Sequence, residues 1–95
     1  MIIQFVKFKS GLPNAEVQRV MKERAPPFRM LPGLVQKYYG REKRTGDFTG
    51  VYFWDCEQSL REFQQTDLAR TIPSAYEVES PPRIEFFDVL FPLRG

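Results

Sequence analysis

The fold of this chain is decided by residues 33–63, whose sequence is GLVQKYYGREKRTGDFTGVYFWDCEQSLREF. Two runs within it, 34–41 (LVQKYYGR) and 48–54 (FTGVYFW), are rich in β-branched and aromatic side chains, which favours strands. Between them Thr45-Gly46 predicts a tight turn, because glycine accepts the positive φ that hairpin turns require. Asp55 follows the second run as a predicted helix N-cap, so the stretch predicts strand, turn, strand and helix.

The predicted turn also assigns the side chains of the hairpin to two faces. With Thr45-Gly46 at the centre, Tyr39 lies opposite Tyr52, and Lys37 lies opposite Trp54. Paired residues share a face, as do residues two apart along a strand, so these four side chains are expected to lie together. The other face is then expected to carry Gln36, Tyr38, Val51 and Phe53.

Strands are also predicted at both ends of the chain. Residues 2–8 (IIQFVKF) and 84–91 (IEFFDVLF) are largely apolar on both faces. After the first of them, Pro13 suits the first turn of a helix, and apolar residues recur at helical spacing through Val17 and Met21. Pro26-Pro27 is expected to end this helix, because the residue before a proline is pushed out of the α region.

A second helix is expected from Asp55 to about Asp67, with Pro73 closing that region and 74–83 forming a polar connector. The element order βαββαβ predicts one domain over residues 1–95, a ferredoxin-like α+β sandwich with two helices on one face of an antiparallel sheet. All four strands are nevertheless apolar on both faces, so the uncovered face would expose a large apolar patch. This patterning predicts a homodimer that pairs through that sheet face.

Composition narrows the chemistry that is possible. The 95 residues include no histidine and one cysteine, Cys56, which exclude an intrachain disulfide and a Ser–His or Cys–His nucleophile. The same facts argue against a structural zinc site. A lone cysteine, and a start without a basic leader and apolar block, predict a cytoplasmic protein. A net charge of +2, and apolar runs far shorter than the roughly 20 residues of a membrane span, predict neither a nucleic-acid nor a membrane partner.

Several of these features resemble a known family. Residues 33–63, followed by a final strand that contains EFFDV, are similar to the dimeric α/β-barrel superfamily, which includes the small antibiotic-biosynthesis-type monooxygenases. The similarity is greatest to the subgroup usually called "putative mono-oxygenases". The segments that carry it are Pro32-Gly33, Gly50-Val51-Tyr52-Phe53-Trp54, Asp55 and Phe87-Asp88-Val89.

The resemblance implies a homodimer whose sheets pack into a barrel-like core, with a mostly apolar pocket between the sheet and the helices of each subunit. It also implies a cofactor-independent monooxygenase, because the better-understood relatives oxidise electron-rich aromatic compounds with O₂ and without a metal, flavin or other prosthetic group. In those relatives Trp, Tyr and Asn side chains hold the substrate anion. Trp54 matches the Trp, but the Asn has no counterpart, since the only asparagine here is Asn14.

The residues of the hairpin make Lys37, Tyr39, Tyr52 and Trp54 the candidate site. A lysine among aromatic side chains stabilises an enolate or phenolate, so Lys37 and Tyr52 are the candidate catalytic groups that polarise a substrate oxygen. Tyr39 and Trp54 are the candidate substrate-binding residues, with Trp54 stacking on the substrate ring. No cofactor and no metal site are predicted.

Other interpretations of the same residues stay open. Tyr52 and Trp54 are equally suited to a packed core, and Tyr39 to a dimer interface. Lys37 could extend to solvent or form a salt bridge with an acidic residue of the last strand. The protein would then be a non-catalytic ligand-binding or interaction homodimer of the same fold.

RNA binding is a further alternative, because RNA-recognition domains share the βαββαβ order and carry aromatic side chains on two central strands. Their third-strand signature begins with a basic residue followed by glycine and an aromatic residue. Here Gly46 is followed by Asp47, and the opening strand lacks the expected exposed aromatic pattern. The sequence therefore favours a small-molecule ligand over RNA.

Overall fold

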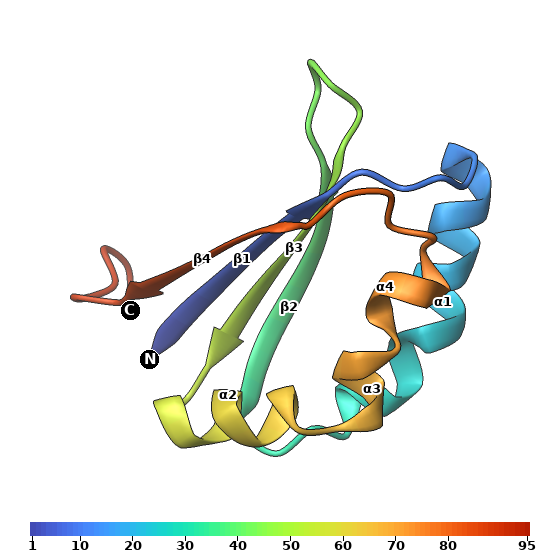
Figure 1. Cartoon of the computed structure of the whole chain (residues 1–95). Coiled ribbons are helices and arrows are strands. Elements are labelled where there is room, and N and C mark those ends of the chain that lie inside the picture. The colour runs from blue at the N-terminus through green and yellow to red at the C-terminus, as the bar shows by residue number, and fades with distance from the viewer.

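A four-stranded antiparallel sheet forms one layer of the structure, and four helices lie together on one side of it (Figure 1). The structure is a computed structural model that describes residues 1–95. The strands are β1 (Ile2–Phe8), β2 (Leu34–Arg41), β3 (Phe48–Trp54) and β4 (Arg83–Asp88), in the spatial order β2-β3-β1-β4. The helices are α1 (Asn14–Arg29), α2 (Glu57–Gln64), α3 (Asp67–Arg70) and α4 (Ile72–Ala75).

The predicted ferredoxin-like α+β fold is confirmed, and the first three strands have the predicted bounds. The last strand is shorter than predicted, because it ends at Asp88 and 89–95 leave the sheet. No helix is long and apolar enough to cross a membrane.

The register of the hairpin differs from the prediction by two positions. Lys37 pairs with Tyr52 and Tyr39 pairs with Gly50, whereas Trp54 pairs with Leu34. The difference arises in the turn, which contains four residues, 43–46, and is closed by the bond from the Glu42 N–H to the Asp47 carbonyl at 2.7 Å. Because the shift is an even number of residues, the predicted assignment of side chains to faces still holds.

The prediction that Pro26-Pro27 ends the first helix was wrong, because α1 continues through both prolines to Arg29. Both prolines are exposed, whereas Phe28, one residue later, is buried and extends the inward stripe of Val17 and Met21. Burial of this large aromatic side chain favours the final helical turn and offsets the backbone hydrogen bonds that the prolines cannot donate.

The segment after β3 also differs from the prediction. The N-cap of α2 is Cys56 and not Asp55, and α2 ends at Gln64. Two short helices, α3 and α4, follow where an extended second helix and a polar connector were expected. Thr66 starts α3 by accepting a hydrogen bond from the Ala69 N–H at 3.2 Å, and Pro73 lies in the first turn of α4, where its missing N–H has no cost.

The two sides of the sheet differ in their cover: the helices lie on one side, here called the inner face, and the opposite side is the outer face. Two buried clusters fill the space between the inner face and the helices. The first consists of Phe8, Val17, Met21, Phe48 and Tyr76. The second consists of Phe28, Tyr52, Trp54, Leu60 and Phe63.

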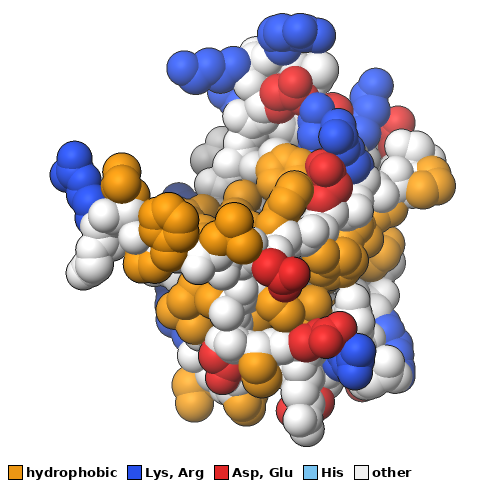
Figure 2. Space-filling view, turned by 90° about the vertical axis from the view of Figure 1, so that its left-hand side faces the viewer, with side chains coloured by type: hydrophobic (Ala, Val, Ile, Leu, Met, Phe, Trp, Pro, Cys, Tyr) orange, Lys and Arg blue, Asp and Glu red, His pale blue; other side chains and the backbone are white.

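The chain has no layer that covers the outer face. This face carries Ile3, Phe5, Val51, Phe53 and Phe87 among its side chains, as the register requires. Figure 2 shows the β4 side of the molecule, where hydrophobic side chains gather and the C-terminal tail projects. The exposed large hydrophobic residues of this region are Ile84, Phe86, Phe87, Leu90, Phe91 and Leu93.

Candidate functional site

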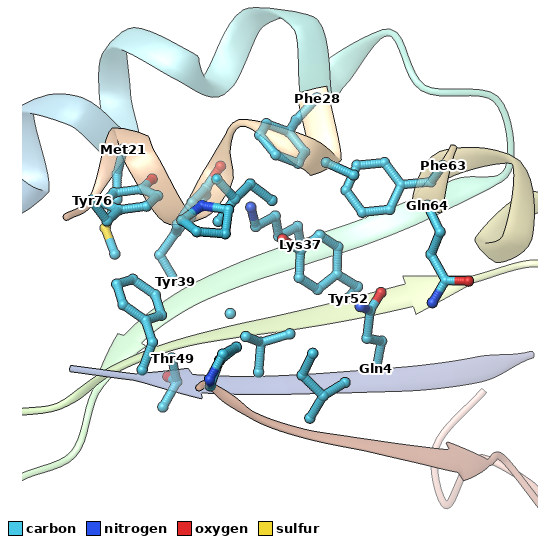
Figure 3. A pocket seen from close by; sticks show the side chains of 18 of the residues that line it. Gln4, Met21, Phe28, Lys37, Tyr39, Thr49, Tyr52, Phe63, Gln64 and Tyr76 are labelled. Carbon is cyan, nitrogen blue, oxygen red and sulfur yellow. The ribbon is translucent and has the colours of Figure 1, made fainter. Parts of the chain in front are cut away.

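A cavity of about 240 Å³ lies between the inner face of the sheet and the helices (Figure 3). Residues of all four strands, of α1 and of the α2–α4 region line it, and 11 of the 19 are hydrophobic. Neither aspartate nor glutamate is present in the wall. Its polar or charged side chains are Gln4, Lys37, Thr49, Gln64 and Arg70, and the hydroxyl groups of Tyr39, Tyr52 and Tyr76, which count among the 11, add further polar atoms.

Lys37 extends from β2 into this cavity, because the register places it on the inner face opposite Tyr52 (Figure 3). Its Nζ atom lies 3.7 Å from the centroid of the Phe28 ring and 4.4 Å from the centroids of Tyr39 and Tyr52. These distances are those of cation–π contacts. The ammonium group thus faces three aromatic rings that come from α1, β2 and β3.

Lys37 forms no salt bridge, so it does not pair with an acidic residue of the last strand, as one alternative interpretation of the sequence proposed. Glu85 of the last strand lies on the outer face, at the opposite edge of the sheet from β2, and pairs with Arg83 Nε at 2.8 Å. Although Lys37 as a whole is half-buried, burial of its amine, together with the smaller effect of the positive charge of Arg24, lowers the pKa of Lys37 to about 7. At neutral pH the amine is therefore divided between its charged and neutral forms.

The pKa values of the tyrosines around the cavity are shifted in the opposite direction, upward. Burial raises the pKa of Tyr52, Tyr39 and Tyr76 above that of a free phenol, because the charged phenolate is disfavoured in a poorly hydrated site. For Tyr39 the positive charges of Arg29 and Arg24 oppose this shift in part. All three phenols stay protonated at neutral pH, and so they remain hydrogen-bond donors.

Gln4 is the buried polar residue of β1, and its side chain is 6% exposed. Its Oε1 accepts a hydrogen bond of 3.0 Å from the indole Nε1–H of Trp54. That bond fixes the amide orientation, because the indole nitrogen is only a donor. The Nε2 group of Gln4 is thereby left as a donor beside the cavity that this residue lines.

The structure brings together three of the four candidate residues. Lys37, Tyr39 and Tyr52 line the same cavity, whereas Trp54 is fully buried and does not line it. Trp54 instead stacks on Tyr52, with ring centroids 6.0 Å apart and an interplanar angle of 6°. Its indole N–H is occupied by Gln4, so Trp54 positions two residues of the wall.

Sequence reasoning missed Gln4, Phe28, Gln64 and Arg70 as wall residues. Gln4 had a detectable signal, because it is the polar member of the otherwise apolar set Ile2, Gln4, Val6 and Phe8. Phe28 had none, since it follows two prolines that predict the end of a helix. No group of three or more His, Cys, Asp or Glu side chains is arranged to hold a metal ion.

Comparison with solved structures supplies relatives of the same fold. A protein from Caulobacter crescentus described as a "putative antibiotic biosynthesis monooxygenase" is 20% identical, with a TM-score of 0.81 over 95% of this chain and 90% of that one. SnoaB, a cofactor-independent oxygenase from Streptomyces nogalater, is 20% identical, with a TM-score of 0.77 over 99% and 98%. A dimeric ferredoxin-like protein of unknown function from Thermobifida fusca is 17% identical, with a TM-score of 0.74 over 93% and 90%.

No protein-family model and no curated protein sequence matches the chain. At the identities above, the likeness to solved structures concerns the fold. The resemblance inferred from the sequence is confirmed on this level: the chain has the ferredoxin-like fold of the antibiotic biosynthesis monooxygenase structures.

Proposed function

We propose that this protein is a homodimeric, cofactor-independent monooxygenase that binds a small aromatic or enolisable compound in the cavity between sheet and helices. The observation that carries this proposal is Lys37, an amine without a carboxylate partner that faces three aromatic rings in a cavity without acidic residues. The fold shared with SnoaB is consistent with this activity.

Lys37 has the properties that an acidic phenol or enol requires. With a pKa of about 7, its neutral form accepts the proton of a bound phenol or enol, and the ammonium that results pairs with the substrate anion. The low polarity of the wall strengthens this pairing, because charges interact more strongly away from water. Removal of the charge at position 37 should therefore abolish both deprotonation and anion binding.

Two further groups are hydrogen-bond donors that can polarise the substrate oxygen. Tyr52 lines the cavity as a protonated phenol, and Gln4 contributes an amide donor held in place by Trp54. Tyr39, on the same face as Lys37, contributes an aromatic surface for the substrate ring. Trp54 would act through Gln4 and Tyr52 and would not itself touch the substrate.

The reaction balances without a reductant when the substrate carries an activated methylene group. The substrate anion adds O₂ at this carbon, a carbon–oxygen bond forms, and Lys37 returns a proton to the peroxide. The hydroperoxide then loses water and leaves a carbonyl group. One oxygen atom enters the substrate, the other leaves as water, and the methylene carbon supplies all four electrons.

The homodimer is supported by the apolar surfaces that the single chain leaves open. The outer face is largely apolar, and β4 is an edge strand with three large hydrophobic residues about half exposed, Ile84, Phe86 and Phe87. The tail adds Leu90, Phe91 and Leu93, of which Leu90 and Leu93 are each 89% exposed. Phe87 lies on the outer face and Ile84 and Phe86 on the inner face of this edge strand. Exposed apolar side chains of this size are typical of an interface.

Thermal stabilisation by electron-rich aromatic and quinol-like compounds, under air and with mass spectrometry of the products, tests the proposal. A ligand at about 100 times its Kd should add about 2.7 kcal/mol to the free energy of unfolding. The expected product has gained one oxygen atom from labelled dioxygen and lost two hydrogen atoms, and Lys37→Met should form none, whereas the exposed-site control Lys22→Met should match the wild type. Binding without product would favour the non-catalytic ligand-binding homodimer, and absence of binding by the whole panel would overturn both.

A further inference from the structure

Lys37 differs from the other four lysines in its surroundings. Lys9, Lys22 and Lys43 are exposed, and Lys7 forms a salt bridge with Glu42. Lys37 alone lines the cavity, and it has no ion-pair partner. The protein thus holds one amine in an apolar site where no negative charge compensates a proton on it.

The charged and titratable groups that face Lys37 all favour its neutral form. The positive charge of Arg24, on α1, acts on Lys37 directly. Arg70, on α3, lines the cavity but is paired with Asp67 at 3.4 Å. Tyr39, Tyr52 and Tyr76 are neutral phenols at neutral pH, because burial raises the pKa of each. No carboxylate lines the cavity, so nothing in its wall restores the pKa of Lys37 from about 7 to the value of a free lysine.

The remaining wall suits a small aromatic guest next to this amine. The rings of Phe28, Tyr39 and Tyr52 surround Nζ at 3.7–4.4 Å. Gly50, across from Tyr39, lets the Tyr52 ring and Lys37 Cε approach the backbone, because a Cβ there would lie 3.2 Å and 3.6 Å from them. A cavity of roughly 150 Å³ is enough for a benzene ring, so one of about 240 Å³ accommodates a substituted ring.

We propose that Lys37 is the nucleophilic amine of a carbonyl-binding site and that it forms a Schiff base with small aromatic aldehydes. The neutral amine attacks the carbonyl carbon and forms a carbon–nitrogen bond. The carbonyl oxygen then leaves as water together with both hydrogens of the amine, so no oxidant or reductant is consumed. The imine is uncharged in its resting form, and an uncharged group is the one that a cavity without anions accommodates best.

This activity uses the cavity of the proposed function but neither dioxygen nor an acidic substrate. The two are therefore separable by experiment. Imine formation is followed under argon, where monooxygenation cannot occur, and a negative result there leaves the oxygenation test unaffected. Conversely, an inactive oxygenase with a reactive Lys37 would contradict the proposed function and support the present inference.

The test is reductive trapping of the folded protein with benzaldehyde and sodium cyanoborohydride under argon, followed by peptide mapping. The expected result is one benzyl group at Lys37, with a rate more than about tenfold above that at Lys22 at pH 7, because an exposed lysine with a pKa near 10.4 is almost wholly protonated there. The ratio of the two rates should fall as the pH rises above 7. Lys22 in the same sample serves as an internal standard, so the pH dependence of the reductant cancels.

The peptide map separates Lys37 from the N-terminal amine of Met1, a primary amine that also reacts with aldehydes. Lys37→Arg should abolish the internal adduct and Lys22→Arg should preserve it, with folding of both checked by thermal melting. Acetaldehyde, a smaller probe, shows whether a lack of reaction with benzaldehyde arises only because the aromatic ring is too large to enter the cavity. Labelling of Lys37 no faster than of Lys22 by both aldehydes would overturn the proposal, and this comparison needs no variant.

Discussion

Lys37 and Tyr52 are direct cross-strand partners on the inner face of the sheet, and the Lys37 Nζ atom lies 4.4 Å from the centroid of the Tyr52 ring. This pairing positions a flexible cationic side chain over a buried phenol. Tyr52 in turn stacks on Trp54, which is fully buried, so the ring beneath the amine is itself held in place. The core and the candidate site therefore share this residue.

The amine of Lys37 should make stability depend on pH between about 7 and 10. Its pKa is about 7 in the folded chain, and a free lysine has about 10.4, so in this window the unfolded chain binds the extra proton. The burial penalty is complete below pH 7 and is relieved as the pH rises to 10. Relative to Lys37→Met, the wild type should gain about 1–3 kcal/mol across the window, after allowance for partial exposure of the side chain. Urea unfolding at several pH values checks this, and a pH-independent difference in the free energy of unfolding between the wild type and Lys37→Met would contradict it.

The hydrogen bond between Gln4 and Trp54 should be a measurable part of the stability. Gln4→Leu leaves the buried indole N–H without an acceptor and should cost about 1–3 kcal/mol. In a Trp54→Phe background the same substitution should cost much less, because no donor remains to be left unpaired. A double-mutant cycle measured by urea unfolding gives the coupling, and a coupling near zero would show that the bond is not formed in solution.

Gly33 and Gly46 should respond differently to alanine although both have a positive φ, 79° and 77°. At Gly46 an added Cβ meets nothing within 4 Å, so Gly46→Ala should cost only the backbone strain, about 1 kcal/mol. At Gly33 the Cβ would lie 2.1 Å from Ser59 Oγ, and so Gly33→Ala should cost clearly more. Thermal or urea unfolding of the two variants measures the difference, and equal costs would argue against the close approach of Gly33 to Ser59 of α2.

Association through the outer face should depend on Phe87. This residue is 48% exposed, so Phe87→Asp should leave the single chain folded while it places a charge within the proposed interface. Met30→Asp, at the end of α1 and 81% exposed, is the matched control outside that face. Sedimentation velocity should show a dimer for the wild type and Met30→Asp and a monomer for Phe87→Asp. A monomeric wild type at micromolar concentration would contradict the proposed homodimer.

The strands could be predicted from sequence because their alternating and doubly apolar patterns are long and distinct. The assignment of Lys37, Tyr39 and Tyr52 to one face depended only on whether the register was shifted by an even or an odd number of residues. It is therefore correct although the predicted register was wrong by two positions. The register itself could not be predicted, since the residues around Thr45-Gly46 are compatible with turns of two or four residues.

The helices were harder to predict because tertiary contacts override local signals there. Pro26-Pro27 would end an isolated helix, but burial of Phe28 extends α1 past them. The position of Trp54 also depends on tertiary packing. Its face of the strand was predicted correctly, but α2 covers that end of the sheet and buries the ring. Of the four candidate residues, only Lys37, Tyr39 and Tyr52 therefore line the cavity.

The central claim is that Lys37 is an unpaired, desolvated amine in a small-molecule cavity, and its pKa is the most direct measurement. A titration of ¹³Cε-labelled lysines by NMR, with the Lys37 signal assigned by its loss in Lys37→Arg, reports this value. The account predicts a midpoint of about 7 for Lys37. A midpoint near 10.4, the value of a free lysine, would contradict it.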